Sequence, residues 1–141
     1  MAPEPATARP VILCAGSLHH DLIVEAPGLP RIDQTLTGTA VRTAFGGKGG
    51  NQAAAAARAG AEVHMAGAVG SDDAAITLRA ALDDAGVRRA GVQTHSGASG
   101  MSVAISLPDG SYGAVIVSGA NLLFRPEAVI FPKACTLLLL Q

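Results

Sequence analysis

The feature that most constrains this chain is a run of glycines that leads directly into an alanine-rich stretch. Residues 46–51 read GGKGGN, and Gln52–Ala59 is alanine apart from Gln52 and Arg58. Glycine reaches backbone conformations that other residues avoid, whereas alanine has the highest helix propensity. Gly60 is a typical residue to end such a helix. We therefore expect a glycine loop over 46–51 that feeds the amino terminus of a helix.

Strand and helix signals alternate around this loop. Val11–Ala15 and Val63–Val69 are mostly apolar and are each followed by glycine, as is typical of buried strands. Asp73–Ala85 has apolar residues at helical spacing, with Ser71 or Asp72 as the expected cap. Because strand and helix alternate, the sequence predicts an α/β fold with a parallel sheet.

Other segments have β character without helices between them. Residues 35–45 alternate roughly as in a half-exposed strand, and Met101–Leu107 and Tyr112–Ser118 flank a PDGS turn, which predicts a hairpin. Thr136–Leu140 is an uninterrupted apolar strand signal, and the sequence ends one residue later. Since a buried parallel strand normally feeds a crossover to another strand, we expect the chain to be part of something longer.

Composition excludes several classes of partner. The chain has 141 residues, 49% of them hydrophobic and 15% charged, with a net charge of −1 and no Trp. We therefore expect a globular domain with no nucleic-acid and no membrane partner. Residues 1–10 contain three prolines and no long apolar stretch, so we expect a disordered tail there and a cytoplasmic protein.

The glycine run also suits a polar ligand. Free N–H groups at a helix start favour oxygen-rich or anionic ligands, and Lys48 adds further donors. Asn51 both donates and accepts, which suits a sugar hydroxyl, although it is equally a residue that caps a helix. A purely structural glycine turn is the other open interpretation. The run is not a nucleotide phosphate loop of the Walker A type, because Gly49 and not Ser or Thr follows Lys48.

His19 and His20 precede Asp21 directly. Adjacent side chains of an extended chain point in opposite directions, so we expect no metal site at this pair.

Two stretches carry a resemblance to a known family. Residues 46–53 read GGKGGNQA and are followed by an alanine-rich helix, and residues 67–73 read GAVGSDD. Together they resemble the first signature of the ribokinase-like (PfkB) carbohydrate kinases, over about residues 11–141. The resemblance implies a ribokinase-like parallel sheet flanked by helices, with a small β lid formed by segments near 22–45 and 99–118. It also implies that the carboxy-terminal half of the fold is missing.

The resemblance also implies a set of sugar-binding residues. In this family an Asp shortly after the first strand binds sugar hydroxyls, and Asp21 stands at that place. The glycine loop contributes Gly47 and Lys48, and its Asn corresponds to Asn51. Where the family's ribokinases have Asn two positions before the Asp, this chain has His19, which predicts a different pattern of accepted sugar hydroxyls.

The catalytic half of the family's site has no counterpart in this sequence. The general-base Asp of a Gly-Ala-Gly-Asp motif, the adenine pocket and the magnesium-linked residues are all expected beyond Gln141. The resemblance thus implies an ATP-dependent sugar kinase of which this chain is the sugar-binding part, inactive alone. ATP and Mg²⁺ are expected for the full-length family member and not for this chain. The lid is also expected to support a homodimer.

Two alternatives from other classes are open. One is a catalytically dead sugar-binding or dimerisation module, and the other is a structural fragment that does not fold stably alone.

Overall fold

The computed structural model describes residues 8–141. Most of the expected tail lies outside these residues. Within it, the Arg9 guanidinium donates hydrogen bonds of 2.7 Å to the carbonyl oxygens of Gly60 and Ala61. The Pro10 carbonyl accepts a hydrogen bond of 2.9 Å from the Glu62 amide. Residues 9 and 10 are therefore tied to the segment that follows the first helix.

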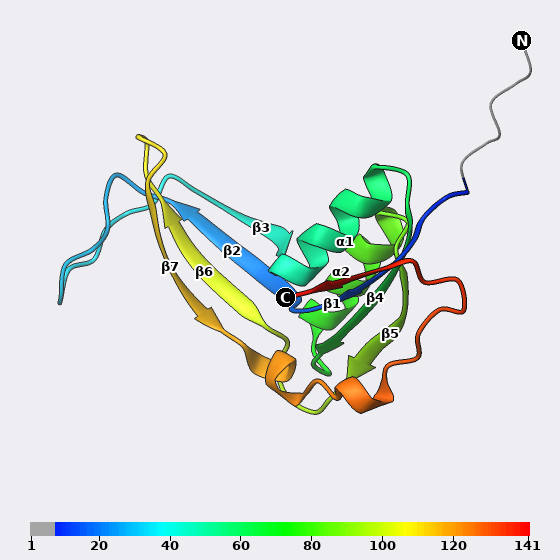
Figure 1. Ribbon diagram of the computed structural model, residues 1–141. Helices are drawn as coiled ribbons and strands as arrows, with labels where there is room; N and C mark the ends of the chain where they lie inside the picture. Colours follow the sequence, from blue (N-terminus) through cyan, green and yellow to red (C-terminus); the bar gives the residue numbers. More distant parts are fainter. Residues whose placement is uncertain (1–7) are drawn as a thin grey trace, which may run out of the picture.

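The first sheet is parallel throughout and has the strand order β5-β4-β1-β8 (Figure 1). Its strands in chain order are β1 (Val11–Ala15), β4 (Glu62–Val69), β5 (Arg88–Thr94) and β8 (Leu137–Leu140). The expected strands at 11–15, 63–69 and 136–140 are present, whereas β5 was not anticipated.

Two helices cover one face of this sheet. They are α1 (Lys48–Arg58) and α2 (Asp73–Asp84). Ala53, Leu78 and Leu82 from the helices join the strand residues Cys14 and Met65 in one buried cluster. Burying each large apolar side chain of this kind contributes about 1.5–3 kcal/mol. The 3₁₀ turn Gly119–Leu123 (η1) contacts β4, and a second 3₁₀ turn, Pro126–Ala128 (η2), follows it before the loop that leads to β8.

A second sheet stands beside the first (Figure 1). Its strand order is β3-β2-β6-β7, with β2 and β6 parallel and the outer pairs antiparallel. The strands in chain order are β2 (His19–Glu25), β3 (Ala40–Gly46), β6 (Met101–Ser106) and β7 (Tyr112–Val117). The expected hairpin at 101–118 is present. β3 begins five residues later than position 35, because residues 34–38 form no regular element.

The first helix begins earlier than the sequence suggested. α1 starts at Lys48 and not at Gln52, so Gly49 and Gly50 form its first turn instead of a loop. Gly47 is the cap position, with φ at +87°, and no side chain caps the helix. The alternative that Asn51 caps the helix is therefore wrong. The physical reason is close packing: a Cβ atom on Gly49 would lie 2.5 Å from the carbonyl carbon of Gly16.

The expected cap of the second helix is present. The Asp72 carboxylate accepts a hydrogen bond of 3.0 Å from the Ala75 amide. Over residues 8–141, neither helix has both the length and the apolar character needed to cross a bilayer.

Candidate functional site

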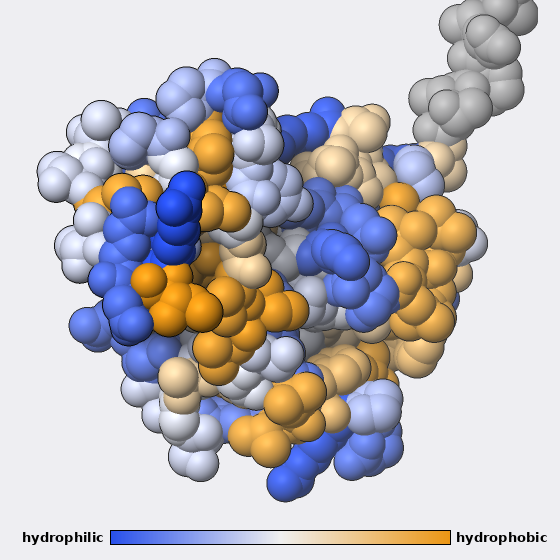
Figure 2. Space-filling view, turned by 90° about the vertical axis from the view of Figure 1, so that its left-hand side faces the viewer, coloured by the Kyte–Doolittle hydropathy of each residue, from blue (hydrophilic) through white to orange (hydrophobic). Residues whose placement is uncertain are grey.

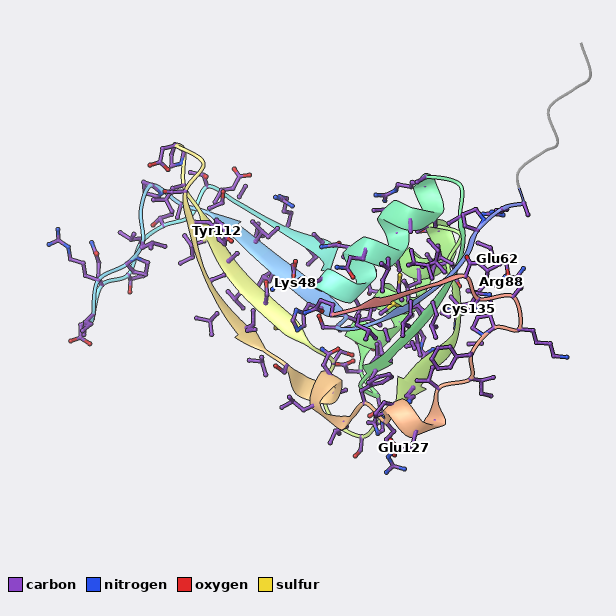
Figure 3. The ribbon with its side chains drawn as sticks, viewed as in Figure 1. Lys48, Glu62, Arg88, Tyr112, Glu127 and Cys135 are labelled. Atoms are coloured by element: carbon purple, nitrogen blue, oxygen red, sulfur yellow. The ribbon has the colours of Figure 1, made fainter. Side chains whose placement is uncertain are left out.

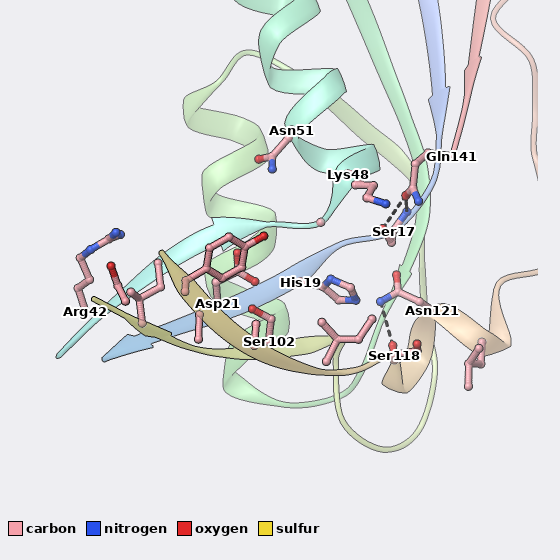
Figure 4. A pocket seen from close by; sticks show the side chains of 18 of the residues that line it. Ser17, His19, Asp21, Arg42, Lys48, Asn51, Ser102, Ser118, Asn121 and Gln141 are labelled. Atoms are coloured by element: carbon pink, nitrogen blue, oxygen red, sulfur yellow. Dashed lines mark hydrogen bonds between the residues drawn. The ribbon is translucent and has the colours of Figure 1, made fainter. Parts of the chain in front are cut away.

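A cavity of about 650 Å³ lies between the second sheet, the start of α1 and the carboxyl end of β1 (Figure 4). All five residues expected to bind the ligand line it: His19, Asp21, Gly47, Lys48 and Asn51. They come from β2, from the turn before α1 and from α1 itself. The fold thus brings together residues that are up to 32 positions apart in the sequence.

Asp21 lies on β2, which pairs with β3 on one side and β6 on the other. It is on the inner face of the second sheet, which is the face that lines the cavity. Its partners are Ala44 on β3 and Ser102 on β6. Ser102 also lines the cavity, so a hydroxyl stands beside the carboxylate. Gly46 makes room for this carboxylate, because a Cβ atom on Gly46 would collide with the Asp21 oxygens. One carboxylate can accept hydrogen bonds from two adjacent hydroxyl groups.

The start of α1 supplies the donors. A Cβ atom on Gly47 would lie 2.5 Å from the Ser17 carbonyl oxygen, so the turn passes directly over the end of β1. The Gly50 amide donates to that carbonyl at 3.1 Å, which anchors the first turn. The amides of Lys48 and Gly49 precede the first possible intrahelical acceptor and have no helical partner. These amides and the ammonium group of Lys48 bring positive charge to this end of the cavity.

His19 lies near the junction of the two sheets, between Lys48 and Asn121 in the close view (Figure 4). Gly100 packs against it, since a Cβ atom there would overlap its ring. The neighbouring His20 does not line the cavity, and its Nδ1 is buried without a hydrogen-bond partner among the described residues. The two imidazoles therefore do not converge on one ion. Over residues 8–141, no group of three or more His, Cys, Asp or Glu side chains is placed to hold a metal.

Several other lining residues were not predicted from the sequence to bind the ligand. The Ser17 hydroxyl donates a 2.7 Å hydrogen bond to Gln141 Oε1, and Asn121 Nδ2 donates one of 2.9 Å to the Ser118 carbonyl (Figure 4). Arg42 and Tyr112 lie farther along the second sheet, and Figure 3 shows Tyr112 near its far end from Lys48. Ser17 and Asn121 stand in short segments that resemble pieces of the family, whereas Arg42 and Tyr112 belong to no local motif. Only the pairing of distant strands places them on the cavity wall.

A second polar cluster fixes the entry to β6. The Asp72 carboxylate accepts hydrogen bonds from the Ser99 amide at 2.8 Å and the Ser99 hydroxyl at 2.6 Å. The Gly70 amide donates to the Ser99 hydroxyl oxygen at 2.9 Å. Burial raises the pKa of Asp72, but the hydrogen bonds from Ser99 and Ala75 outweigh burial, so the pKa lies below its usual value. The cluster ties the second sheet to the start of α2.

Comparison with known proteins gives consistent matches. The family model described as pfkB family carbohydrate kinase matches residues 10–137. The ribokinase of Bacillus subtilis (strain 168) is 38% identical over 110 residues, which are 78% of this chain and 38% of that protein. The chain thus spans about two fifths of the length of this curated relative.

Solved structures agree with the sequence matches. The structure of ribokinase from Cryptococcus neoformans var. grubii serotype A in complex with ADP has a TM-score of 0.75 and 33% identity, covering 94% of this chain and 40% of that one. The structure of Arabidopsis thaliana ribokinase complexed with ribose and ATP has a TM-score of 0.70 and 32% identity, covering 82% and 38%. The expected ribokinase-like α/β fold is confirmed, and the chain belongs to the pfkB family of carbohydrate kinases.

Proposed function

We propose that this protein is the sugar-binding part of a PfkB-family carbohydrate kinase, which as a whole transfers the γ-phosphate of ATP to a sugar hydroxyl. One observation carries the proposal: Asp21 from β2 and Lys48 and Asn51 from α1 line a single cavity. The matched relatives point the same way, since one of the solved ribokinases holds ribose and ATP.

The polar groups of the cavity complement a sugar. Asp21 accepts hydrogen bonds from hydroxyls, Lys48 and the free amides of α1 donate to hydroxyl oxygens, and Asn51 does both. The inner face of the second sheet adds apolar side chains, Ile23 and Ala104, which suit the C–H face of a sugar ring. We propose that this sheet acts as the lid over the bound sugar. His19 then sets the pattern of hydroxyls that the site accepts.

ATP and Mg²⁺ belong to the proposal only for the whole kinase. The cavity in this chain offers one carboxylate, Asp21, which the proposal assigns to sugar binding. Among residues 8–141, no group of three or more His, Cys, Asp or Glu side chains is placed to hold the metal of a nucleotide–metal pair. Because phosphoryl transfer needs a base and charge neutralisation as well as positioning, we propose that the 141-residue chain alone has no kinase turnover.

The experiment measures binding and turnover together. The purified chain is titrated calorimetrically with a panel of pentoses and hexoses, and the same panel is run in a coupled assay of ATP consumption. We expect saturable binding of at least one sugar, loss of that binding in Asp21→Asn, and no sugar-dependent ATP consumption. Absence of binding across the panel would contradict the proposed sugar site. Clear sugar-dependent ATP consumption would contradict the proposal that the chain alone has no kinase turnover.

A second candidate function rests on the outer face of the second sheet. Val103, Val115 and Val117 lie on the face opposite the cavity and are 40%, 71% and 60% exposed. Figure 2 views the molecule from the side of this sheet and shows apolar areas between hydrophilic ones. Exposed apolar patches on a sheet commonly mark an interface. We propose that two copies of the chain pair through this face. Such pairing is compatible with a kinase and also with a dimerisation module that has no catalytic activity.

A further inference from the structure

Gln141 lies where two parallel strands end side by side. Its backbone amide donates to the Ala15 carbonyl at 3.0 Å, one step beyond the last paired residues of β1 and β8, which are Ala15 and Leu140. The strand order β5-β4-β1-β8 puts β1 between β4 and β8, so the order of the strands along the chain reverses at β1. In open α/β sheets, ligands bind beside the carboxyl ends of the strands at such a point.

Ser17 holds the side-chain amide of Gln141 in one orientation. Gln141 Oε1 accepts hydrogen bonds from the Ser17 hydroxyl at 2.7 Å and from the Ser17 backbone amide at 3.3 Å. A backbone N–H group can only donate, so the atom that faces it is the oxygen of the side-chain amide and not the nitrogen. Nε2 therefore lies on the side away from Ser17, and within residues 8–141 it makes no hydrogen bond.

This free nitrogen distinguishes Gln141 from the other amide at this end of the cavity. Asn121 uses both ends of its side chain within the fold, because Oδ1 accepts from the Leu18 amide and Nδ2 donates to the carbonyls of Leu18 and Ser118. Gln141 also lines the cavity, but only its oxygen is engaged. Because the engaged oxygen fixes the orientation, Nε2 offers a donor that loses little conformational freedom when a ligand binds.

The side chain of Gln141 lies next to the start of α1. A Cβ atom on Gly16 would lie 3.0 Å from Gly49 Cα and 3.1 Å from Gln141 Cβ, so the first turn of α1 and Gln141 flank the same point of the backbone. Figure 4 shows Lys48 and Gln141 at this end of the cavity. The Lys48 ammonium group, the free amides of α1 and Gln141 Nε2 are all donors, whereas the Asp21 carboxylate lies farther along β2.

We propose that Gln141 Nε2 donates a hydrogen bond to a hydroxyl oxygen of the bound sugar, and that Ser17 is the positioning residue that orients it. This inference rests on the proposed sugar site and adds a residue to it. A sugar that covers Nε2 removes its water, so a sugar without an oxygen at that place leaves the donor unpaired and loses affinity. Gln141 is then a specificity-determining residue that reads one hydroxyl, independently of the hydroxyls bound by Asp21.

The test removes one hydrogen-bonding group at a time from the protein and from the sugar. Ribose, fructose and glucose, each with its monodeoxy analogues, are titrated calorimetrically into the 141-residue chain. In Gln141→Glu the side chain still accepts from Ser17, but an acceptor replaces the free donor. Gln141→Ala removes the whole amide, and Ser17→Ala removes the stronger of the two contacts that orient it. Gln52→Glu makes the same change at an exposed residue of α1 that does not line the cavity, and is the matched control.

We expect one deoxy analogue to bind the wild type about fivefold more weakly than its parent sugar, as the loss of one hydrogen bond predicts. In Gln141→Glu and Gln141→Ala the parent sugar is expected to weaken to the level of this analogue, so that the difference between the two disappears. Ser17→Ala is expected to reduce the same difference and to leave the contributions of the other hydroxyls unchanged. Gln52→Glu is expected to behave as the wild type.

The role of Gln141 and the sugar site fail in different ways. If every hydroxyl contributes as much in Gln141→Glu as in the wild type, Gln141 makes no contact with the sugar, while the sugar site stands. An equal loss over all hydroxyls, or the same loss in Gln52→Glu, would also overturn the role of Gln141, because it would mark a structural or a charge effect. Absence of binding by every parent sugar would overturn the sugar site, and the role of Gln141 with it.

Discussion

The side chain of Asn121 hydrogen-bonds to both backbone groups of Leu18. Its Oδ1 accepts from the Leu18 amide at 2.9 Å, and its Nδ2 donates to the Leu18 carbonyl at 2.9 Å. Leu18 is fully buried and lies between β1 of the first sheet and β2 of the second, whereas Asn121 lies in the turn after β7. The amide group therefore closes the junction between the two sheets, directly beside the cavity.

This contact predicts that Asn121→Asp lowers the stability of the fold, although the two side chains have nearly the same shape. The carboxylate of the variant still accepts a hydrogen bond from the Leu18 amide. Its second oxygen, however, places negative charge against the carbonyl oxygens of Leu18 and Ser118, which accept hydrogen bonds from Nδ2 in the wild type. We expect the free energy of unfolding to fall by about 2–3 kcal/mol, and by about 1–2 kcal/mol in Asn121→Ala. Urea denaturation of the three proteins measures the difference. An Asn121→Asp variant as stable as the wild type would show that the amide donor contributes nothing.

The Asp72 cluster predicts a pH dependence of stability. The pKa of Asp72 is lower in the folded chain than in the unfolded chain, where it is about 3.9. The stabilisation from its charged form is therefore present above about pH 4 and is lost as pH falls through the folded pKa. We expect the difference in thermal midpoint between wild type and Asp72→Asn to be constant between pH 5 and 7 and to shrink below pH 4. A difference that grows as pH falls would contradict the assigned direction.

The close approach of α1 to Gly16 predicts that alanine is harmful at Gly49 in spite of its helix propensity. A Cβ atom there would lie 2.5 Å from the Gly16 carbonyl carbon and 2.8 Å from the Ser17 amide nitrogen. We expect Gly49→Ala to cost about 1–3 kcal/mol of unfolding free energy, against the gain of about 1 kcal/mol that alanine gives in an open helix. Gln52→Ala, at an exposed position of the same helix, is the control and is expected to be neutral or slightly stabilising.

Local signals explain what could be read from the sequence. The apolar runs at β1 and β8, the Asp72 cap and the PDGS hairpin turn each carry their own chemistry, and all were predicted at or near their places. β5 was missed because its sequence, RRAGVQT, has no apolar run and Val92 is its only buried residue. The start of α1 was missed because glycine is a poor helix former. The contact with Gly16 that requires glycine there joins residues 33 positions apart.

The cavity residues, like the elements of the fold, divide into those that the sequence predicted and those that depend on contacts between distant segments. The glycine run and its resemblance were enough to name Asp21, Gly47, Lys48, Asn51 and His19, and the structure places all five on one cavity. Their role in sugar binding stays a prediction, as do the cytoplasmic location and the expected partners. The resemblance implied a β lid from segments near 22–45 and 99–118, but which of its side chains line the cavity could not be predicted, because that depends on the register between β2, β3, β6 and β7.

The outer face of the second sheet predicts a dimer that a single charge disrupts. Val115 lies near the middle of β7 and is 71% exposed, so a glutamate there would place a charge within the apolar patch. We expect Val115→Glu to shift the protein from dimer to monomer in sedimentation or light scattering at micromolar concentration. Ile130→Glu, at an exposed apolar residue outside this sheet, is the control and should leave the dimer intact. A wild-type monomer at all concentrations would exclude pairing through this face.

The central claim is that the start of α1 and β2 form one sugar-binding site. The most direct measurement is a titration of the isotope-labelled chain with the panel of sugars, followed through the backbone amide resonances. The account predicts saturable shifts at Gly47, Lys48, Gly49, Asn51 and Asp21 that disappear together in Asp21→Asn. Saturable shifts confined to other parts of the chain, or no shift with any member of the panel, would contradict it.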